Sequence, residues 1–461
     1  MEDTIAAIAT AFGEGGIGII RMSGEKSKDI LNQIFIPISK KNSEQHQIVN
    51  RRLTYGIVID PQTNQTIDEV MAVFMKAPYT YTMEDIAEIH CHGSSISLQK
   101  TLALVLRFGA RLAEKGEFTK RAFLNGRLDL SQAEAVIDLI KAKTDKSFQV
   151  ALSQMEGELS SKIKEIRSDL MDILVQIAVN LDYPDEDIEV LTYKKQEESL
   201  LLIGDKIDKL LSLADTGRML RDGIAVTIIG KPNVGKSSLM NAFLRESRAI
   251  VTEIPGTTRD IIEESMSVRG IPIRLTDTAG IHETDDIIEK IGIEKSKQSF
   301  NQADLIIFML DASQPLMKED LEIANYIGER KTIVLINKTD LEISLCEKEI
   351  KRTLPGAVIL YTSMKNETGL NELEEEIEKM VYGGDLVQKN SMMVTNVRHK
   401  ELLLQAKQSI NDALKMIKKM EAMDFIEVDI KRAWELLGEM IGETVSEDII
   451  NEVFSRFCLG K

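Results

Sequence analysis

Cysteine is scarce in this chain of 461 residues, which contains only Cys91, Cys346 and Cys458. Three widely spaced cysteines build no disulfide framework, and without a Cys-x-x-Cys pair they indicate no structural zinc site. The first residues, Met-Glu-Asp-Thr-Ile, contain neither a basic segment nor a long apolar run, so we expect no signal peptide. No stretch approaches the roughly 18 apolar residues of a membrane span. We therefore expect a cytoplasmic protein in a reducing compartment, with no membrane partner.

Positive charge is also in short supply. The sequence has 57 Lys and Arg residues against 74 Asp and Glu residues, and its net charge is −17. This balance excludes non-specific wrapping of nucleic acid, because phosphate binding needs a positive surface; a local basic patch that holds a folded RNA stays open. Hydrophobic residues make up 43% and charged residues 28%, so sizeable cores can form, and the length allows roughly three domains.

The first domain is expected to span residues 1–118 and to have a compact α+β fold. Short β-type runs separated by turns predict strands, and one apolar stripe predicts a helix. The strands are expected at Ile5–Ala9, Ile17–Arg21, Leu53–Ile59 and Val70–Met75, and the helix at Ser94–Phe108.

Two stretches, residues 119–215 and 382–461, are expected to be helical. In the first, apolar residues recur at three- and four-residue steps from Leu152 to Ile177 and predict one long amphipathic helix, which Pro184 interrupts. The second stretch alone would have only a modest core. We therefore expect the two stretches to form one helical domain, with the region between them inserted into it.

The middle region, residues 216–381, alternates apolar strands with helical patterns, which is typical of a doubly wound α/β domain. Its strand segments are nearly continuous apolar runs, as expected when helices cover both faces of a sheet. These runs are Ala225–Ile229, Ile273–Thr276, Leu305–Leu310, Ile333–Ile336 and Val358–Tyr361.

A glycine-rich loop follows the first of these strands. The segment Gly230-Lys-Pro-Asn-Val-Gly-Lys-Ser has the spacing of a P-loop and lies between a strand and a helix. Its glycines let backbone N–H groups point at phosphate oxygens, and the helix N-terminus adds positive potential. Lys236 is expected to reach the β- and γ-phosphates as a catalytic group, and Ser237 to ligate Mg²⁺. The expected phosphate contacts are Asn233, Val234, Gly235, Lys236, Ser237 and Ser238.

Two further segments are expected to contact Mg²⁺ and the γ-phosphate. In the first, Asp277-Thr278-Ala279-Gly280, the Asp277 carboxylate can hold Mg²⁺ through water, and the Gly280 amide can donate to the γ-phosphate. The second is a switch loop that must bring a threonine to Mg²⁺ when the γ-phosphate is present; we favour Thr258 over Thr257. The expected contacts of this loop are Thr252, Glu253, Ile254, Pro255, Gly256, Thr257 and Thr258.

The segment Asn337-Lys338-Thr339-Asp340 predicts which base is bound. Guanine presents N1–H beside its 2-amino group, and the Asp340 carboxylate can accept both hydrogen bonds, whereas adenine has an acceptor in place of N1–H. Asn337 can contact the other edge of the base, and Ser363-Met364-Lys365 can close over it through backbone N–H groups. The ordered motifs predict a GTP hydrolase. The fold class is therefore multidomain α/β and α: an N-terminal α+β domain, a helical domain and an inserted Ras-like P-loop GTPase domain.

These motifs do not identify the group that orients the attacking water. Ile281 follows the Asp277–Gly280 motif at the position where a Ras-type enzyme has glutamine, and isoleucine cannot orient water. Arg259 is a candidate for an arginine finger. Glu289 could reach the water from the next segment, although a solvated helix carboxylate is the commoner role for such a residue.

Three segments outside the GTPase motifs carry a specific resemblance. The stretch from Asp3 to Gly24, the block from Gly116 to Leu130 and the terminal Phe454-Ser-Arg-Phe-Cys-Leu-Gly-Lys resemble the MnmE/TrmE family of tRNA-modification GTPases. The likeness extends over essentially the whole chain. It implies a homodimeric, K⁺-stimulated GTPase that forms a heterotetramer with a flavin-dependent partner, MnmG/GidA, and acts on tRNA. It also implies an aminomethyl-type group on C5 of the wobble uridine, with a tetrahydrofolate derivative, in the 5-formyl or methylene form, as one-carbon source.

Matched positions extend this resemblance to single residues of the GTPase region. Asn233, Thr252, Ile254 and Thr257 would ligate K⁺, which would supply positive charge in the place of an arginine finger. Glu289 matches the family's water-orienting glutamate, and the resemblance therefore favours a catalytic role over a solvated one.

Matched positions near the two ends of the chain would bind folate at a dimer interface. These are Arg21, Glu88, Arg127 and Lys461. A carboxylate can pair with the pterin N3–H and amino group, and cations suit the glutamyl tail. The resemblance also raises a catalytic or tRNA-proximal role for Cys458, which needs a nearby cation to stabilise its thiolate.

Three alternatives stay open at this point. A ribosome-assembly GTPase of the Era or Der type shares the GTPase motifs, although this chain has one P-loop and no KH-like GxxG loop after residue 381. A non-enzymatic switch would bind GTP without turning it over. A folate-binding module with a vestigial GTPase domain is disfavoured by the intact Lys236, Asp277 and Asp340.

Overall fold

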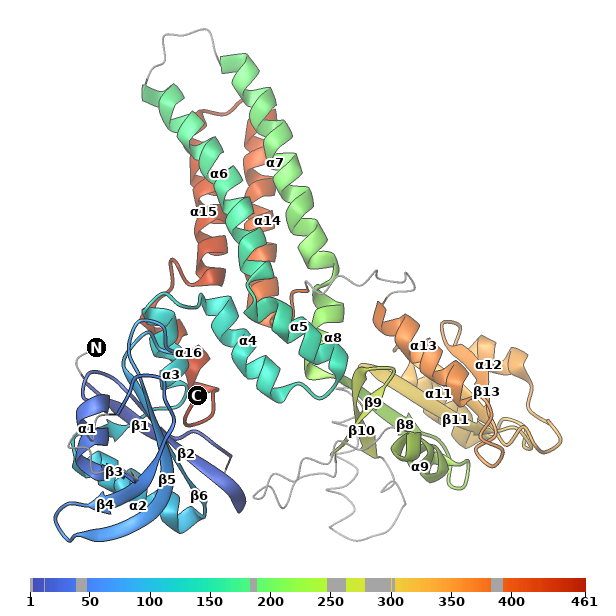
Figure 1. The fold of residues 1–461 in the computed structure, drawn as a ribbon. Helices are drawn as coiled ribbons and strands as arrows, with labels where there is room; N and C mark the ends of the chain where they lie inside the picture. The colour runs from blue at the N-terminus through green and yellow to red at the C-terminus, as the bar shows by residue number, and fades with distance from the viewer. Residues whose placement is uncertain are drawn as a thin grey trace, which may run out of the picture. The chain divides into compact units, whose positions relative to one another are not determined.

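The computed structural model describes residues 3–11, 13–38, 48–182, 189–246, 263–277, 300, 303–382 and 393–461 (Figure 1). The chain divides into two compact units. The first comprises Met1–Ile137, Ser160–Arg167 and Trp434–Lys461, and the second comprises Asp138–Leu159 and Ser168–Ala433. Within the described ranges, none of the helices combines the length and apolar character needed to cross a bilayer.

The first unit is built on a seven-stranded sheet in the order β3-β4-β5-β6-β2-β1-β7. Neighbouring strands are antiparallel except β1 and β7, which run parallel. Its strands are β1 (Ile5–Ile8), β2 (Gly15–Ser23), β3 (Phe35–Pro37), β4 (Thr54–Asp60), β5 (Gln65–Met75), β6 (Ile86–Gly93) and β7 (Arg111–Leu112). The four predicted strands are confirmed as β1, β2, β4 and β5, and the α+β character follows from the helices that cover this sheet.

The short strand β1 is buried on both faces. Side chains alternate across a strand, so Ala6 and Ile8 join the core beneath α1 and α2, whereas Ile5 and Ala7 pack against Phe118 of α3. This second contact fixes α3 on the sheet, close to the segment that carries the predicted Arg127. The helices of the unit include α1 (Ser27–Ile34), α2 (Ser95–Arg107), α3 (Glu117–Leu124) and α16 (Glu447–Ser455).

The second unit contains a six-stranded sheet in the order β13-β12-β11-β8-β10-β9. The antiparallel pair is β9 with β10, and the other neighbouring pairs are parallel. Its strands are β8 (Ile224–Ile229), β9 (Glu263–Val268), β10 (Ile271–Asp277), β11 (Leu305–Asp311), β12 (Thr332–Asn337) and β13 (Val358–Tyr361). All five predicted apolar runs are strands of this sheet, which is mixed because β9 adds an antiparallel edge.

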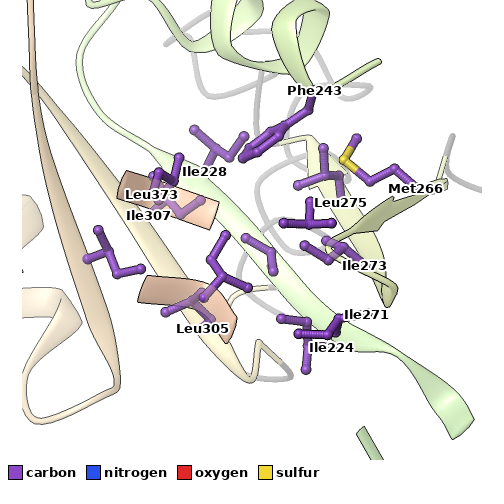
Figure 2. Packing of buried hydrophobic residues seen from close by; sticks show 14 of the residues in the cluster. Ile224, Ile228, Phe243, Met266, Ile271, Ile273, Leu275, Leu305, Ile307 and Leu373 are labelled. Atoms are coloured by element: carbon purple, nitrogen blue, oxygen red, sulfur yellow. The ribbon is translucent and has the colours of Figure 1, made fainter. Parts of the chain in front are cut away.

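This sheet separates two hydrophobic cores. Along β11, Ile307 faces the first core and Phe308 faces the second. Figure 2 shows Ile307 in the first core together with Phe243 and Leu373, which come from the covering helices α9 (Lys236–Glu246) and α13 (Leu370–Tyr382). The second core lies under α11 (Lys318–Ile327) and α12 (Glu347–Thr353). Burial on both faces explains why these strands are apolar at nearly every position.

Within the described residues, the other helices are α4 (Leu130–Lys141), α5 (Asp145–Met155), α6 (Glu158–Asp182), α7 (Glu189–Ser212), α8 (Ala214–Asp222), α14 (Val397–Lys418) and α15 (Met423–Ile441). The single long helix predicted from Leu152 is wrong, because the helix is interrupted between α5 and α6. Gly157 has a φ of 90° there, a left-handed conformation that ends a helix and that glycine adopts at little cost. The expected interruption at Pro184 lies outside the described residues.

Candidate functional site

The carboxyl ends of the parallel strands in the second unit meet at one edge of the sheet. The register pairs Asp277 with Ile228, Asp311 with Asn337, and Ile336 with Tyr361. The strand β8 lies between β10 and β11, so the chain passes to opposite sides of β8 along the sheet. Ligands of open α/β sheets bind outside the strand ends at such a switch point, and the P-loop segment follows β8 directly.

The loop of residues 230–235, called here the phosphate loop, has three residues in the positive-φ region. The φ angles of Gly230, Asn233 and Gly235 are 150°, 64° and 111°. A side chain at Gly235 would collide with the Asn337 amide, so glycine is required there. The ammonium of Lys236 donates to the carbonyls of Gly230, at 2.6 Å, and Lys231, at 2.9 Å. The loop therefore curls around the lysine expected to contact phosphates.

The first turn of α9 presents the other predicted phosphate contacts. The helix begins at Lys236, and both Ser237 and Ser238 lie at least partly open to solvent, whereas Val234 is buried in the first core. Accessible hydroxyls at a helix N-terminus have the chemistry to meet an anion and its metal ion. The backbone of Asp277 ends β10 beside β8.

Asn337 fastens the phosphate loop to the loops that follow β12 and β13. Its side-chain amide donates to the Val234 carbonyl at 2.7 Å, and its amide oxygen accepts from the Met364 N–H at 3.1 Å. The side chain is buried, with 2% of the residue exposed. Sequence reasoning assigned Asn337 to the edge of the base and missed this linking role, which depends on two segments remote in the chain.

Residues 337–340, called here the guanine loop, place a carboxylate at the rim of the site. The Ser363 hydroxyl donates to Asp340 at 2.7 Å, and this bond holds the pKa of the carboxyl below its usual value. Thr339 donates through both its N–H and its hydroxyl to the Thr362 carbonyl. The ammonium of the exposed Lys365 lies 4.0 Å from Asp340. The Asp340 carboxylate is therefore an ionised hydrogen-bond acceptor at this edge of the sheet.

Several predicted residues lie outside the described residues. They are Thr252, Glu253, Ile254, Pro255, Gly256, Thr257, Thr258, Thr278, Ala279, Gly280, Ile281 and Glu289, together with Arg259. The structure brings together the remaining residues of the phosphate loop, the guanine loop and the Ser363–Lys365 segment.

A second group of predicted residues clusters on the sheet of the first unit. Arg21 on β2 and Glu88 on β6 occupy paired positions, and the guanidinium Nε lies 2.8 Å from the carboxylate. The Arg127 guanidinium lies 4.6 Å from the centre of the Tyr81 ring and donates to the Tyr81 carbonyl at 3.0 Å. The Arg21 guanidinium lies 6.0 Å from the same ring. Tyr81, which sequence reasoning missed, therefore joins the two predicted arginines.

Below these residues, a fully buried guanidinium holds the domain together. Arg121 of α3 has no exposed side-chain surface and forms ion pairs with Asp3, Glu84 and Glu117 at 2.8, 3.0 and 3.0 Å. Burial raises the pKa of the Glu117 carboxyl, but hydrogen bonds from Arg111, the Glu114 N–H and Arg121 outweigh burial and leave the pKa below its usual value. The spacing of Glu117 and Arg121, one helical turn apart, was the available sequence signal.

The end of the chain docks on this unit. Gly460 is buried, and a side chain there would collide with the Ile8 carbonyl at the end of β1. Cys458 is exposed, and its carbonyl accepts from the Gly116 N–H at 3.3 Å. Lys461 follows Gly460 directly, next to the end of β1, and Ala7 of that strand pairs with Arg21 in the sheet.

A cavity elsewhere in the second unit has no comparable chemistry. It has a volume of about 130 Å³ and lies where the end of α4 meets α5 and α8. Its charged lining includes Arg221 and Asp138, which pair with each other at 2.8 Å. Paired charges leave little binding capacity for a ligand, so we assign this cavity no role.

Two family models match the chain. The MnmE helical domain matches residues 130–458, and the N-terminus of the GTP-binding protein TrmE matches residues 4–127. A tRNA modification GTPase MnmE from Alkaliphilus metalliredigens (strain QYMF) is 52% identical over 461 residues, covering 100% of both chains. The protein of the same name from Alkaliphilus oremlandii (strain OhILAs) is 54% identical over 462 residues, again covering 100% of both.

Two solved structures are each similar to part of the chain. The G domain of the FeoB iron transporter of T. maritima is 28% identical with a TM-score of 0.26, covering 34% of this chain and 97% of that one. A variant of Aquifex aeolicus Era bound to GDP and AlF4⁻ is 28% identical with a TM-score of 0.26, covering 40% of this chain and 65% of that one. The full-length identities to the tRNA modification GTPases separate the chain from the ribosome-assembly alternative.

Proposed function

The chain belongs to the MnmE family of tRNA modification GTPases, and we propose that its GTP hydrolysis drives modification of C5 of the wobble uridine of tRNA. It is a GTP hydrolase that acts in tRNA modification. The observation that carries the mechanism is the convergence of the phosphate loop, the guanine loop and the Ser363–Lys365 segment at one sheet edge.

Each part of this edge has a distinct task with GTP. The backbone N–H groups of the phosphate loop and the first turn of α9 hold the phosphate oxygens. The Lys236 ammonium exchanges its two carbonyl acceptors for the β- and γ-phosphates. The Asp340 carboxylate accepts from guanine N1–H and the 2-amino group, and the Ser363 hydroxyl keeps it ionised and oriented.

Mg²⁺ and K⁺ are the proposed metal ions of this site. The Ser237 hydroxyl, the Asp277 carboxylate and the Thr258 hydroxyl are oxygen donors, which suits Mg²⁺. Asn233, exposed in a left-handed turn with φ 64°, offers an amide oxygen for K⁺, together with Thr252, Ile254 and Thr257. When bound, these ions stabilise the negative charge that develops on the phosphates during hydrolysis.

Glu289 is the proposed water-orienting residue. A carboxylate can accept a hydrogen bond from the attacking water and direct its lone pair at the γ-phosphorus. We expect Glu289→Ala to keep GTP affinity and to lose most turnover. Near-normal turnover of this variant, measured as phosphate release, would remove the assignment.

The cluster around Arg21 is the proposed site for the one-carbon donor. Glu88 suits the pterin N3–H and amino group, and Arg21, Arg127 and Lys461 suit the carboxylates of the glutamyl tail. The Arg21 Nε lies 2.8 Å from the Glu88 carboxylate, and this ion pair fixes the orientation of the carboxylate. Titration of Glu88→Ala with formyl-tetrahydrofolate tests this role, because unchanged affinity would contradict it. Cys458, exposed near the docked terminus, is the proposed tRNA-proximal or catalytic thiol.

The proposed assembly combines four domain segments and a partner. Residues 1–118 form the folate-binding and dimerisation domain, residues 119–215 and 382–461 form the helical domain, and residues 216–381 form the inserted GTPase domain. The chain works in the cytoplasm as a homodimer and joins the flavin-dependent MnmG/GidA in a heterotetramer.

Two experiments test this function. Phosphate release in K⁺ should exceed release in Na⁺ several-fold, and turnover without an added activator separates the enzyme from a passive switch; equal rates in both salts would remove the K⁺ site. Mass spectrometry of wobble uridines from cells lacking the gene should show loss of the C5 substituent. An unchanged uridine profile would contradict the role in tRNA modification.

A further inference from the structure

Two acid–lysine pairs hold the two loops of the nucleotide site from one neighbouring segment. Residues 311–320, called here the brace segment, run from the end of β11 into the first turn of α11. Asp311 lies 2.6 Å from the Lys338 ammonium in the guanine loop. Asp320 lies 2.7 Å from the Lys231 ammonium in the phosphate loop. A single stretch of chain therefore contacts both ends of the site.

Both carboxylates are nearly removed from solvent. The side chain of Asp311 is 7% exposed and that of Asp320 is 3% exposed. The Ser313 N–H and hydroxyl donate to the second oxygen of Asp311 at 2.9 and 2.7 Å, and the Met317 N–H donates to Asp320 at 3.0 Å. The lysine side chains are more exposed, at 34% for Lys338 and 13% for Lys231. Loss of either lysine would leave a nearly buried carboxylate uncompensated, so each pair constrains the position of its loop.

The two paired lysines lie next to residues that are proposed to bind the nucleotide. Lys338 has a φ of 66°, a left-handed conformation that lysine rarely adopts, and it lies two residues before the base-reading Asp340. The Ala312 N–H also donates to the Asn337 carbonyl at 2.8 Å. In the phosphate loop, the carbonyl of Lys231 accepts from Lys236 at 2.9 Å.

We propose that Asp311 and Asp320 are positioning residues that hold the guanine loop and the phosphate loop at a fixed separation for GTP. This inference rests on the proposed GTP site. Asp311 acts on base recognition through Lys338, and Asp320 acts on phosphate binding through Lys231. Neither carboxylate touches the nucleotide.

Substitution of Asp311 and substitution of Asp320 should change nucleotide affinity in different ways. Asp311→Asn should raise the dissociation constant of GDP about tenfold, the lower end for a lost hydrogen bond to a charged group. Because Asp340 is displaced, the preference for GDP over inosine diphosphate, which lacks the 2-amino group, should shrink. Asp320→Asn should weaken both diphosphates equally. For both variants the KM for GTP should rise with the dissociation constant while kcat stays within about twofold.

The experiment is a displacement titration of fluorescent methylanthraniloyl-GDP by GDP and inosine diphosphate on the full chain. Glu375→Gln is the matched control, because this exposed acid pairs with Arg269 at 3.2 Å in the same unit, remote from the site. Lys338→Met and Lys231→Met break the same pairs from the other side if an aspartate variant does not fold. Unchanged GDP affinity in folded variants would overturn the brace alone. A wild-type chain without guanine preference would overturn the proposed function and the brace together.

Discussion

The nucleotide site of the second unit is built from short contiguous segments, whereas the Arg21 cluster of the first unit gathers single residues from separate segments. In the second unit, each loop follows one strand, and the parallel register brings the loops to one edge. In the first unit, Arg21, Tyr81, Glu88 and Arg127 come from separate elements. A site of the first kind can be predicted from contiguous sequence motifs. A site of the second kind can be found only from the tertiary fold or from a family resemblance.

The two units also use buried charge differently. The second unit pairs one lysine with one aspartate at each loop, whereas the first surrounds the buried Arg121 with three carboxylates. The lysine–aspartate pairs can fix the positions of the two loops at the nucleotide site. The buried guanidinium, which contacts three segments, stabilises the fold of the first unit. A substitution that destabilises the first unit should therefore leave nucleotide binding by the second unit measurable.

The largest expected effect is on base recognition. Asp340→Asn replaces one carboxylate oxygen with an amide donor that faces the guanine 2-amino group, and it removes the negative charge from the other oxygen. Both charge-assisted bonds to guanine are then lost, so GTP affinity should fall about 10²- to 10⁴-fold, from about 1.5–3 kcal/mol per bond to a charged group. The asparagine amide can instead donate to the 2-carbonyl of xanthine, and XTP affinity should rise. Competition titrations with both nucleotides measure the switch. A wild-type ratio of GTP to XTP affinity in this variant would contradict the base-reading role.

The next effect is on the stability of the first unit. Arg121→Met leaves three carboxylates without their buried partner and should cost about 3–5 kcal/mol of unfolding free energy. The chain has one tryptophan, Trp434, which lies in this unit, so its fluorescence in urea reports the loss. GDP affinity should stay within about twofold, because the nucleotide site lies in the other unit. A GDP affinity that falls with the stability would show that the two units are not separable.

A pH effect should follow from Glu117. Its folded pKa lies below the ordinary value, so its ionised form stabilises the unit above the unfolded pKa of about 4.3, and this stability is lost as pH falls through the folded pKa. Glu117→Gln should cost roughly 1.5–3 kcal/mol at pH 7. The difference from wild type should shrink as the pH falls from about 5 to about 3, measured by urea midpoints. A difference independent of pH would exclude the ionic role.

The smallest effect should come from Arg127→Ala. Its guanidinium lies over the Tyr81 ring at the surface, where such a contact contributes about 0.5–1 kcal/mol. The variant should therefore fold nearly normally and hydrolyse GTP at the wild-type rate, yet bind formyl-tetrahydrofolate more weakly. Calorimetric titration measures that loss. Equal folate affinity would remove Arg127 from the proposed site.

The sequence predicted much of both sheets, because buried strands are continuous apolar runs and half-buried strands alternate. It also predicted the phosphate and guanine loops. The break at Gly157 escaped prediction, since the apolar stripe continues through it while only the left-handed φ of 90° reveals it. The linking role of Asn337 and the stacking role of Tyr81 depend on contacts between remote segments. Periodicity carries no information about such contacts.

We expect the edge of the six-stranded sheet to select guanine nucleotides. Parallel equilibrium titrations of the wild-type chain with GDP and ADP, in Mg²⁺, measure this selectivity. Because a site built to hydrogen-bond a group strongly rejects analogues that lack it, GDP should bind at least about 100-fold more tightly than ADP. Comparable affinities for the two nucleotides would contradict this expectation.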